Sequence, residues 1–287
     1  MENFTVNING VISKGSEAKI SVFDRGFLYG DSVYEATRTF DQKPFRINQH
    51  VDRLFESALK ISLIPTLSKE QICSEIEKTI QSSKLKNATL RIVLSRGTNS
   101  DLGLDPELSG PNNLVIFTKE IKANPSSWLT DGVSMTFYQK KSSVSGALPK
   151  TGNYQENLLA HKHAHDLGFY DSFMVNPEGY VTEGTTSNAW IIKDSVVYTP
   201  GLNCGVLEGL SRKTLFEMQE KKKLPLKIIE KNLTLGDFLS ADECFITSTT
   251  RNLVPVTKIN QTQIGSGKPG TQTLELLKLY LSFVQSL

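Results

Sequence analysis

Four short segments in the second half of the sequence carry residue types that can do chemistry together. They are residues 148–154 (LPKTGNY), 180–184 (YVTEG), 208–212 (EGLSR) and 245–250 (FITSTT). Lys150 in the first segment offers an amine nucleophile, and Glu183 in the second offers a carboxylate directly after a predicted strand. The last two segments predict turns rich in hydroxyl and main-chain N–H groups, a combination that binds phosphate.

One ligand needs an amine, a carboxylate and a phosphate site together, and that ligand is pyridoxal 5'-phosphate. Its aldehyde takes a lysine as a Schiff base, its ring nitrogen pairs with an acidic group, and its phosphate needs N–H and O–H donors. Taken singly, Lys150 reads as an exposed loop lysine and Glu183 as a solvated carboxylate. Because all four motifs occur in one order, we predict an enzyme with pyridoxal 5'-phosphate as its cofactor.

Two turns and one arginine are candidates for the phosphate. Residues 209–212 predict the opening of a helix, whose free N–H groups attract anions, although Ser211 alone is equally well explained as an N-cap. A second donor cluster follows a buried strand, at Ser248, Thr249 and Thr250. Arg53 lies near the start of a predicted helix and is expected to complete the phosphate clamp, its alternative being a solvated helix arginine.

A histidine cluster offers a different chemistry, that of a metal. His161 and His165 share one face of a predicted helix, with His163 between them. No acidic residue has zinc spacing, and no glutamate occupies the position that an H-E-x-x-H motif requires. We therefore predict no metal site.

The composition is that of an ordinary globular protein of 287 residues. Hydrophobic residues make up 38% and charged residues 22%, and 32 Lys plus Arg against 30 Asp plus Glu leave a net charge of +2. Three separated cysteines without a Cys-x-x-Cys pair favour neither disulfides nor zinc. The N-terminus lacks a signal-peptide pattern, and no apolar run approaches the roughly 20 residues of a membrane span. We expect a cytoplasmic protein with no nucleic-acid or membrane partner.

The order of predicted elements indicates a two-domain protein of mixed α+β or α/β class. Strands are predicted at 4–8, 10–12, 90–94 and 114–117, with two helices capped by Asn48 and Ser68. Further strands are expected at 133–138, 172–175, 189–192, 196–198, 226–229 and 243–246, with helices at 155–167, after Ser211 and from 270 to 287. The predicted division is a small N-terminal domain at 1–120, a linker at 121–131 and a larger C-terminal, cofactor-binding domain at 132–287.

These residues resemble the class IV aminotransferases of fold type IV, which include branched-chain and D-amino-acid aminotransferases and aminodeoxychorismate lyases. The resemblance begins at residues 23–35 (FDRGFLYGDSVYE), continues through 50–54 and reaches 254–256 (VPV), so it covers nearly the whole chain. It implies a D-amino-acid aminotransferase-like fold and a homodimer.

The resemblance also assigns roles. It implies that Lys150 holds the cofactor and moves the substrate proton, that Tyr154 binds the phenolic oxygen, and that Glu183 pairs with the ring nitrogen. It implies that the phosphate is held by Arg53, the Leu210 and Ser211 amides, the Ser211 hydroxyl and Thr249, with Ser248 in the same cluster.

Within the family, the Lys-x-Gly-Asn-Tyr motif at 150–154 and Tyr29-Gly30 look most like the branched-chain enzymes. Arg91 falls where those enzymes place an arginine for the substrate carboxylate, although their Tyr-x-Arg-Pro context is missing. The Arg-x-His pair of the D-amino-acid enzymes and the arginine that lyases place before a Gly-Tyr are both absent. Other candidates for contact with the substrate are Tyr29, Tyr34, Arg38, Thr250 and Arg251, the last of which also reads as an exposed strand-end arginine.

We therefore predict a transaminase that moves an amino group between a branched-chain L-amino acid and a 2-oxo acid such as 2-oxoglutarate, by ping-pong Schiff-base chemistry. A D-amino-acid aminotransferase and an aminodeoxychorismate lyase are alternatives that use the same cofactor. A cofactor-binding protein without catalysis is the alternative from another class. The joint presence of Lys150, Glu183 and the phosphate candidates counts against it.

Overall fold

The chain folds into two compact units in a computed structural model that describes residues 3–141 and 146–287. The first unit is Met1–Lys122 with Pro149–Tyr154, and the second is Ala123–Leu148 with Gln155–Leu287. This division differs from the predicted one, which assigned residues 149–154 to the C-terminal domain. The segment that carries Lys150 therefore packs with the N-terminal residues.

The first unit is built on a six-stranded antiparallel sheet in the order β2-β1-β6-β5-β3-β4. Its strands are β1 (Phe4–Ile8), β2 (Val11–Lys14), β3 (Ser32–Phe40), β4 (Lys43–Pro44), β5 (Ala88–Ser95) and β6 (Asn113–Glu120). The predicted N-terminal hairpin is confirmed, since Ile8 pairs with Val11 across Asn9 and Gly10. Both turn residues have positive φ angles, 52° and 89°, which an Asn-Gly turn accommodates.

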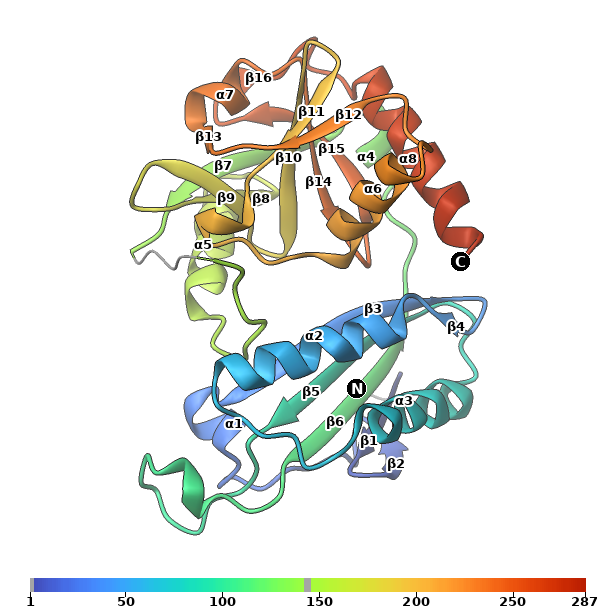
Figure 1. The fold of residues 1–287 in the computed structure, drawn as a ribbon, viewed down its shortest axis with the longest axis vertical. Helices are drawn as coiled ribbons and strands as arrows, with labels where there is room; N and C mark the ends of the chain where they lie inside the picture. The colour runs from blue at the N-terminus through green and yellow to red at the C-terminus, as the bar shows by residue number, and fades with distance from the viewer. Residues whose placement is uncertain (1–2, 142–145) are drawn as a thin grey trace. The chain divides into compact units, whose positions relative to one another are not determined.

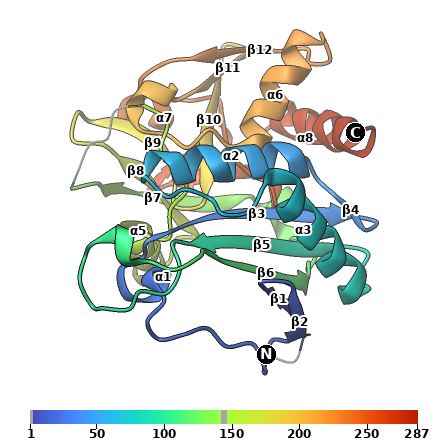
Figure 2. The ribbon, with the colours of Figure 1, turned by 60° about the horizontal axis from the view of Figure 1, so that its bottom comes forward.

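Two helices, α2 (Ile47–Lys60) and α3 (Lys69–Ser83), cover one face of this sheet, as Figures 1 and 2 show. Apolar residues of both helices and of the strands form one buried core, which includes Leu54, Ile72, Ile76, Leu90 and Ile92. A shorter helix, α1 (Arg25–Tyr29), precedes β3. The spacing of apolar residues along α2 and α3 thus fixes which helix faces turn towards the sheet.

One predicted helix cap is confirmed and one is wrong. Ser68 caps α3 through a capping box with Gln71, as expected. Asn48 does not cap α2, because the helix already begins at Ile47, after an N-cap at Arg46 with a left-handed φ of 48°. Asn48 is therefore inside the first turn, where its side chain cannot act as the cap.

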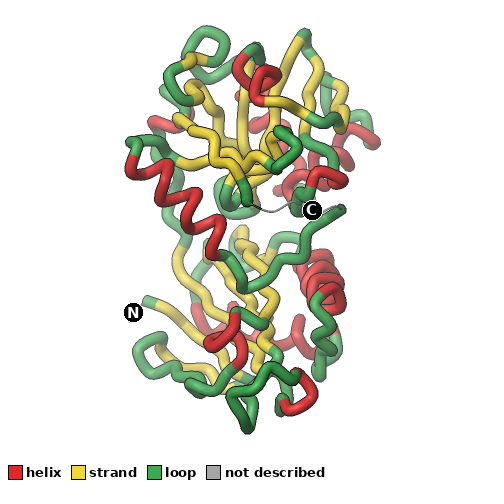
Figure 3. Tube along the Cα trace, turned by 90° about the vertical axis from the view of Figure 1, so that its left-hand side faces the viewer, coloured by secondary structure: helices red, strands yellow, loops and turns green. Residues whose placement is uncertain are grey.

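The second unit contains a ten-stranded sheet whose middle closes on itself. The order is β12-β11-β10-β14-β15-β7-β8-β9-β13, with β16 on β15 and an additional pairing of β9 with β10. That pairing joins β10, β14, β15, β7, β8 and β9 into a barrel, the strands of which Figure 3 draws in yellow. The strands are β7 (Val133–Gln139), β8 (Asp171–Val175), β9 (Tyr180–Gly184), β10 (Ser187–Lys193), β11 (Val196–Thr199), β12 (Lys227–Glu230), β13 (Leu233–Thr234), β14 (Glu243–Ser248), β15 (Asn252–Ile259) and β16 (Thr262–Gln263).

The helices of the second unit are α4 (Ser127–Thr130), α5 (Gln155–Asp166), α6 (Leu210–Glu220), α7 (Leu235–Leu239) and α8 (Thr271–Gln285). The predicted helices at 155–167, after Ser211 and from 270 onward are confirmed within a few residues. The mixture of strands and helices in each unit agrees with the predicted fold class. In the ranges that the structure describes, no helix is both long and apolar enough to span a bilayer.

Candidate active site

The segment that carries Lys150 is held by main-chain hydrogen bonds in the first unit. The Tyr34 N–H donates to the Lys150 carbonyl at 2.9 Å, and the Gly152 N–H donates to the Ser32 carbonyl at 2.8 Å, so the segment runs along the start of β3. The Lys150 N–H donates to Ser57 Oγ of α2 at 3.1 Å. A strand and a helix therefore fix the main chain of Lys150.

The Tyr34 ring gathers three other predicted site residues around it. Lys150 Nζ lies 4.4 Å from the ring centroid, and the Arg91 guanidinium carbon lies 4.1 Å from it. The Tyr154 ring meets Tyr34 edge to face, with centroids 5.8 Å apart. Because Tyr34 is buried and aromatic faces attract cations, it orients both the amine and the guanidinium. Neither a hydrogen bond nor an ion pair ties Arg91 to another residue in the described ranges.

Arg53 is bound on one side by a buried carboxylate. Its Nε donates to Glu35 Oε1 at 2.6 Å and its Nη2 to Glu35 Oε2 at 2.7 Å, and His50 Nδ1 lies 2.7 Å from the same Oε2. Burial alone would raise the pKa of Glu35, but the charges of Arg53 and His50 and these hydrogen bonds outweigh it and lower that pKa to about 2. Burial lowers the pKa of His50. Glu35 is therefore ionised at neutral pH, and Arg53 is fixed in orientation.

Two further candidates of the first unit lie on other contacts. The Tyr29 hydroxyl donates to the Leu102 carbonyl, and Tyr29 ends α1. Arg38 stacks on the Phe40 ring with its guanidinium carbon 4.2 Å from the centroid. Since side chains alternate along a strand, Arg38 shares the β3 face of Tyr34, four residues away.

Glu183 occupies the place where β9 and β10 close the barrel of the second unit. It pairs with Asn188 across the turn, and Asn188 pairs in turn with Thr247 of β14. The Leu207 N–H donates to Glu183 Oε2 at 3.0 Å, and the Asn188 amide donates to the same oxygen at 3.4 Å. Asn188 and the Leu207 main chain were not among the predicted site residues, although Asn188 lies in the polar run that follows Glu183.

The N-terminus of α6 has the donors of a phosphate site. Its N-cap is Gly209, which offers no side-chain acceptor to the first-turn N–H groups, and no acidic residue follows in that turn. Ser211 is therefore not the N-cap, so that alternative is wrong; it is buried, and its Oγ lies 3.1 Å from the Tyr280 hydroxyl. A Cβ at position 209 would stand 2.0 Å from Asn188 Oδ1, so the close approach of α6 to β10 requires glycine.

Ser248, Thr249, Thr250 and Arg251 lie at the turn between β14 and β15. Arg251 donates to Ser248 Oγ, to the Tyr170 hydroxyl, and to both the carbonyl and the hydroxyl of Thr186, at 2.6 to 2.9 Å. The exposed-arginine alternative for Arg251 is therefore wrong. Its N–H groups are largely used in joining the β9–β10 turn to the β14–β15 turn.

The histidine cluster is a feature of the surface of α5. His161 Nδ1 lies 3.2 Å from Asp171 Oδ1, and the His161 side chain is about half exposed, at 54%. Among residues 3–141 and 146–287, no three His, Cys, Asp or Glu side chains are grouped as metal ligands.

The donor set fits the predicted cofactor. The first unit provides an amine and a guanidinium, each fixed by neighbours, at Lys150 and Arg53. The second provides an oriented carboxylate at Glu183 and a helix N-terminus without a side-chain cap at α6. These are the groups that an aldehyde, a pyridine nitrogen and a phosphate require.

Comparison with known proteins gives consistent results. Residues 32–259 match the family model of amino-transferase class IV. The chain is 34% identical over 274 residues to a protein named as a putative branched-chain-amino-acid aminotransferase in Methanocaldococcus jannaschii, covering 94% of this chain and 93% of that protein. It is 31% identical over 280 residues to a D-alanine aminotransferase of Listeria monocytogenes, covering 96% and 94%.

A solved structure extends the comparison to the fold. The branched-chain amino acid aminotransferase of T.th., crystallised with pyridoxamine 5'-phosphate, matches with a TM-score of 0.89 at 25% sequence identity. The match covers 98% of this chain and 94% of that chain. The predicted fold class is confirmed by this similarity.

Proposed function

Since the chain belongs to the class IV aminotransferases, we propose that it transfers the amino group of a branched-chain L-amino acid to a 2-oxo acid such as 2-oxoglutarate. Membership of this family confirms the predicted aminotransferase activity and the predicted cofactor, pyridoxal 5'-phosphate. When bound, that cofactor supplies a ring that accepts the electron pair left at the substrate α-carbon. The substrate pair and the residue roles given below are our proposals.

The observation that carries the proposal is the arrangement around Tyr34. Lys150 Nζ and the Arg91 guanidinium both lie against this one ring, and the main chain of Lys150 is fixed on two sides. We assign Lys150 as the group that holds the cofactor and moves the proton at the substrate α-carbon. We assign Arg91 to the substrate carboxylate, because its side chain is exposed and makes no ion pair among the described residues.

The remaining residues bind and orient. Glu183 keeps the pyridine nitrogen protonated, and Tyr154 binds the phenolic oxygen. The phosphate is held by Arg53, the Leu210 and Ser211 amides, Ser211, Ser248 and Thr249. Tyr29, Tyr34, Arg38 and Thr250 are proposed to line the substrate pocket. Arg251, whose N–H groups are largely used within its own unit, is the weakest of the carboxylate candidates.

Two alternatives concern the substrate. The similarity to the D-alanine aminotransferase spans as much of the chain as that to the branched-chain relative, so a D-amino acid is the second candidate. An aminodeoxychorismate lyase, which shares the cofactor, is the third. We also propose a homodimer in the cytoplasm, as the resemblance implies.

The test is an absorbance spectrum of the purified protein with pyridoxal 5'-phosphate, followed by L-leucine, L-glutamate or D-alanine in separate cuvettes. The band of the lysine-bound cofactor should be lost with L-leucine and L-glutamate and kept with D-alanine. Loss with D-alanine alone would replace the proposal with the D-amino-acid enzyme. A band that none of them changes would favour the lyase.

A further inference from the structure

We propose that Glu35 and His50 are positioning residues for Arg53, which fix its guanidinium to receive the cofactor phosphate. The inference rests on the proposed role of Arg53 and deepens it. It concerns only residues of the first unit, which form one network of direct contacts centred on Glu35.

The carboxylate of Glu35 meets Arg53 edge to edge. Nε and Nη2 of Arg53 donate to the two different oxygens of Glu35, at 2.6 and 2.7 Å. Two parallel hydrogen bonds between planar groups fix both the direction and the plane of the guanidinium. The edge that Glu35 binds is the side-on edge, whereas Nη1 and Nη2 form a different, end-on edge. The carboxylate therefore determines where that end-on edge points.

His50 in turn fixes the carboxylate. Its Nδ1 lies 2.7 Å from Glu35 Oε2, and since an ionised carboxylate only accepts hydrogen bonds, Nδ1 is the donor. Glu35 thus receives three hydrogen bonds and cannot rotate without breaking one of them. The side chains of His50 and Glu35 are 0% and 1% exposed, and that of Arg53 is 12% exposed, so Arg53 is the member of this network nearest to solvent.

The same face of α2 also contacts the segment of the predicted catalytic lysine. His50, Arg53 and Ser57 are three and four residues apart, which places them on one face of the helix. Ser57 accepts the Lys150 N–H at 3.1 Å. By holding this face against β3, Glu35 sets the position of Arg53 directly and supports the position of Lys150 through the helix.

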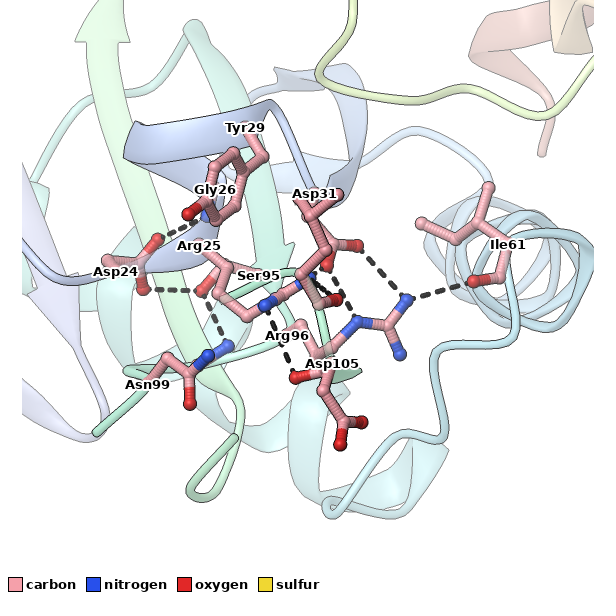
Figure 4. Close-up of polar contacts among 12 residues, drawn as sticks. Asp24, Arg25, Gly26, Tyr29, Asp31, Ile61, Ser95, Arg96, Asn99 and Asp105 are labelled. Carbon is pink, nitrogen blue, oxygen red and sulfur yellow. Dashed lines mark hydrogen bonds and ion pairs between the residues drawn. The ribbon is translucent and has the colours of Figure 1, made fainter. Parts of the chain in front are cut away.

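A neighbouring carboxylate shows what a purely structural network looks like. Asp31 binds Arg25 at 2.9 Å and Arg96 at 2.7 and 3.0 Å, and Figure 4 draws these contacts. Both arginines continue to main-chain carbonyls, those of Ile61 and Ser62 for Arg96 and those of residues 103–105 for Arg25. Asp31 therefore ties loops together, and an Asp31→Asn variant is a matched control for Glu35→Gln.

The experiment compares two ligands that differ only in the phosphate. Protein freed of cofactor is titrated with pyridoxal 5'-phosphate and with pyridoxal, and the dissociation constants are obtained from absorbance. Because supporting residues of a binding group typically contribute about 10- to 100-fold, we expect Glu35→Gln to raise the constant for pyridoxal 5'-phosphate about 10-fold and that for pyridoxal by less than about 2-fold. Asp31→Asn should lower the thermal midpoint and leave the ratio of the two constants unchanged.

A second pair of variants keeps the test informative where Glu35→Gln does not fold. His50→Asn retains an N–H donor near the place of Nδ1, and His50→Leu removes it. We expect His50→Leu to raise the ratio of the two constants and His50→Asn to restore it towards the wild-type value. A merely structural role for His50 would move both constants together.

The outcomes separate this inference from the function on which it rests. Arg53→Gln should raise the constant for pyridoxal 5'-phosphate selectively. If it does, while Glu35→Gln and His50→Leu leave the ratio unchanged or weaken both ligands equally, the positioning role is overturned and the role of Arg53 stands. If Arg53→Gln leaves the ratio unchanged, the proposed role of Arg53 is wrong, and this inference falls with it.

Discussion

The two units fix their candidate site groups by different means. In the first unit, side chains hold side chains: Glu35 binds Arg53, and the Tyr34 ring orients Lys150 and Arg91. In the second, the main chain does most of this, since the Leu207 N–H orients Glu183 and the glycine at 209 allows α6 to approach β10. A substitution in the first unit therefore removes a chemical group, whereas one in the second also moves the main chain.

Lys150→Ala tests the first half of this comparison and has the largest expected effect. Positioned proton transfer contributes about 10²- to 10⁴-fold, and the variant also loses the attachment to the cofactor, so we expect kcat/KM to fall by at least about 10⁴-fold. The main-chain contacts of residue 150 remain, and the thermal midpoint should change little. Activity within about tenfold of the wild type would exclude Lys150 as the catalytic amine.

Glu183→Gln tests the second half without moving the main chain. The glutamine carbonyl can still accept the Leu207 N–H, but it provides no negative charge for the pyridine nitrogen. We expect kcat to fall about 100-fold, on the scale of losing one preorganised electrostatic group. Cofactor binding, measured by absorbance, should persist. An unchanged kcat would show that the ring nitrogen is served by another group.

The acid dependence of stability tests the buried carboxylate of the first unit. The pKa of Glu35 is lowered from its ordinary 4.5 to about 2. Its ionised form therefore contributes fully above pH 4.5, and that contribution disappears as the pH falls through about 2. Comparing wild type with Glu35→Gln by urea unfolding, we expect the difference in unfolding free energy to shrink by about 3 kcal/mol over this range. A difference that is constant with pH would contradict the low pKa.

Gly209→Ala tests the close approach of α6 in the second unit. The added Cβ would meet Asn188 Oδ1 at 2.0 Å, so the helix start must shift, at a cost of about 1–3 kcal/mol. Cofactor affinity should fall together with the thermal midpoint. Gly236→Ala is the matched control, because a Cβ there meets only Thr234 Oγ1, at 3.6 Å. Equal behaviour of the two variants would remove the structural role given to Gly209.

The sequence is sufficient where chemistry depends on neighbours along the chain. Lys150 and Glu183 lie in compact motifs, and Ser68 with Gln71 forms the capping box that their spacing indicates. Strand β15 was not predicted, and it contains Pro255, a residue that argues against a strand interior. The cap predicted at Asn48 is wrong because nothing local shows that Arg46 adopts a left-handed angle and starts the helix earlier.

Contacts between distant residues are beyond what the sequence alone predicts. Glu35 and Arg53 are 18 residues apart, and their bond depends on how α2 packs on β3. The closure of the barrel brings Glu183 beside Leu207, 24 residues away, and only the paired strands show it. The assignment of residues 149–154 to the first unit follows from pairing with β3, which lies far away along the chain.

The central claim is that Lys150 is the amine to which the cofactor is bound. Borohydride reduction of the protein with pyridoxal 5'-phosphate makes that link permanent, and peptide mass spectrometry then locates it. The account predicts a phosphopyridoxyl group on Lys150 in wild type and in Arg251→Lys, and none in Lys150→Ala. A modified lysine elsewhere in the wild-type chain, or no modified lysine at all, would contradict it.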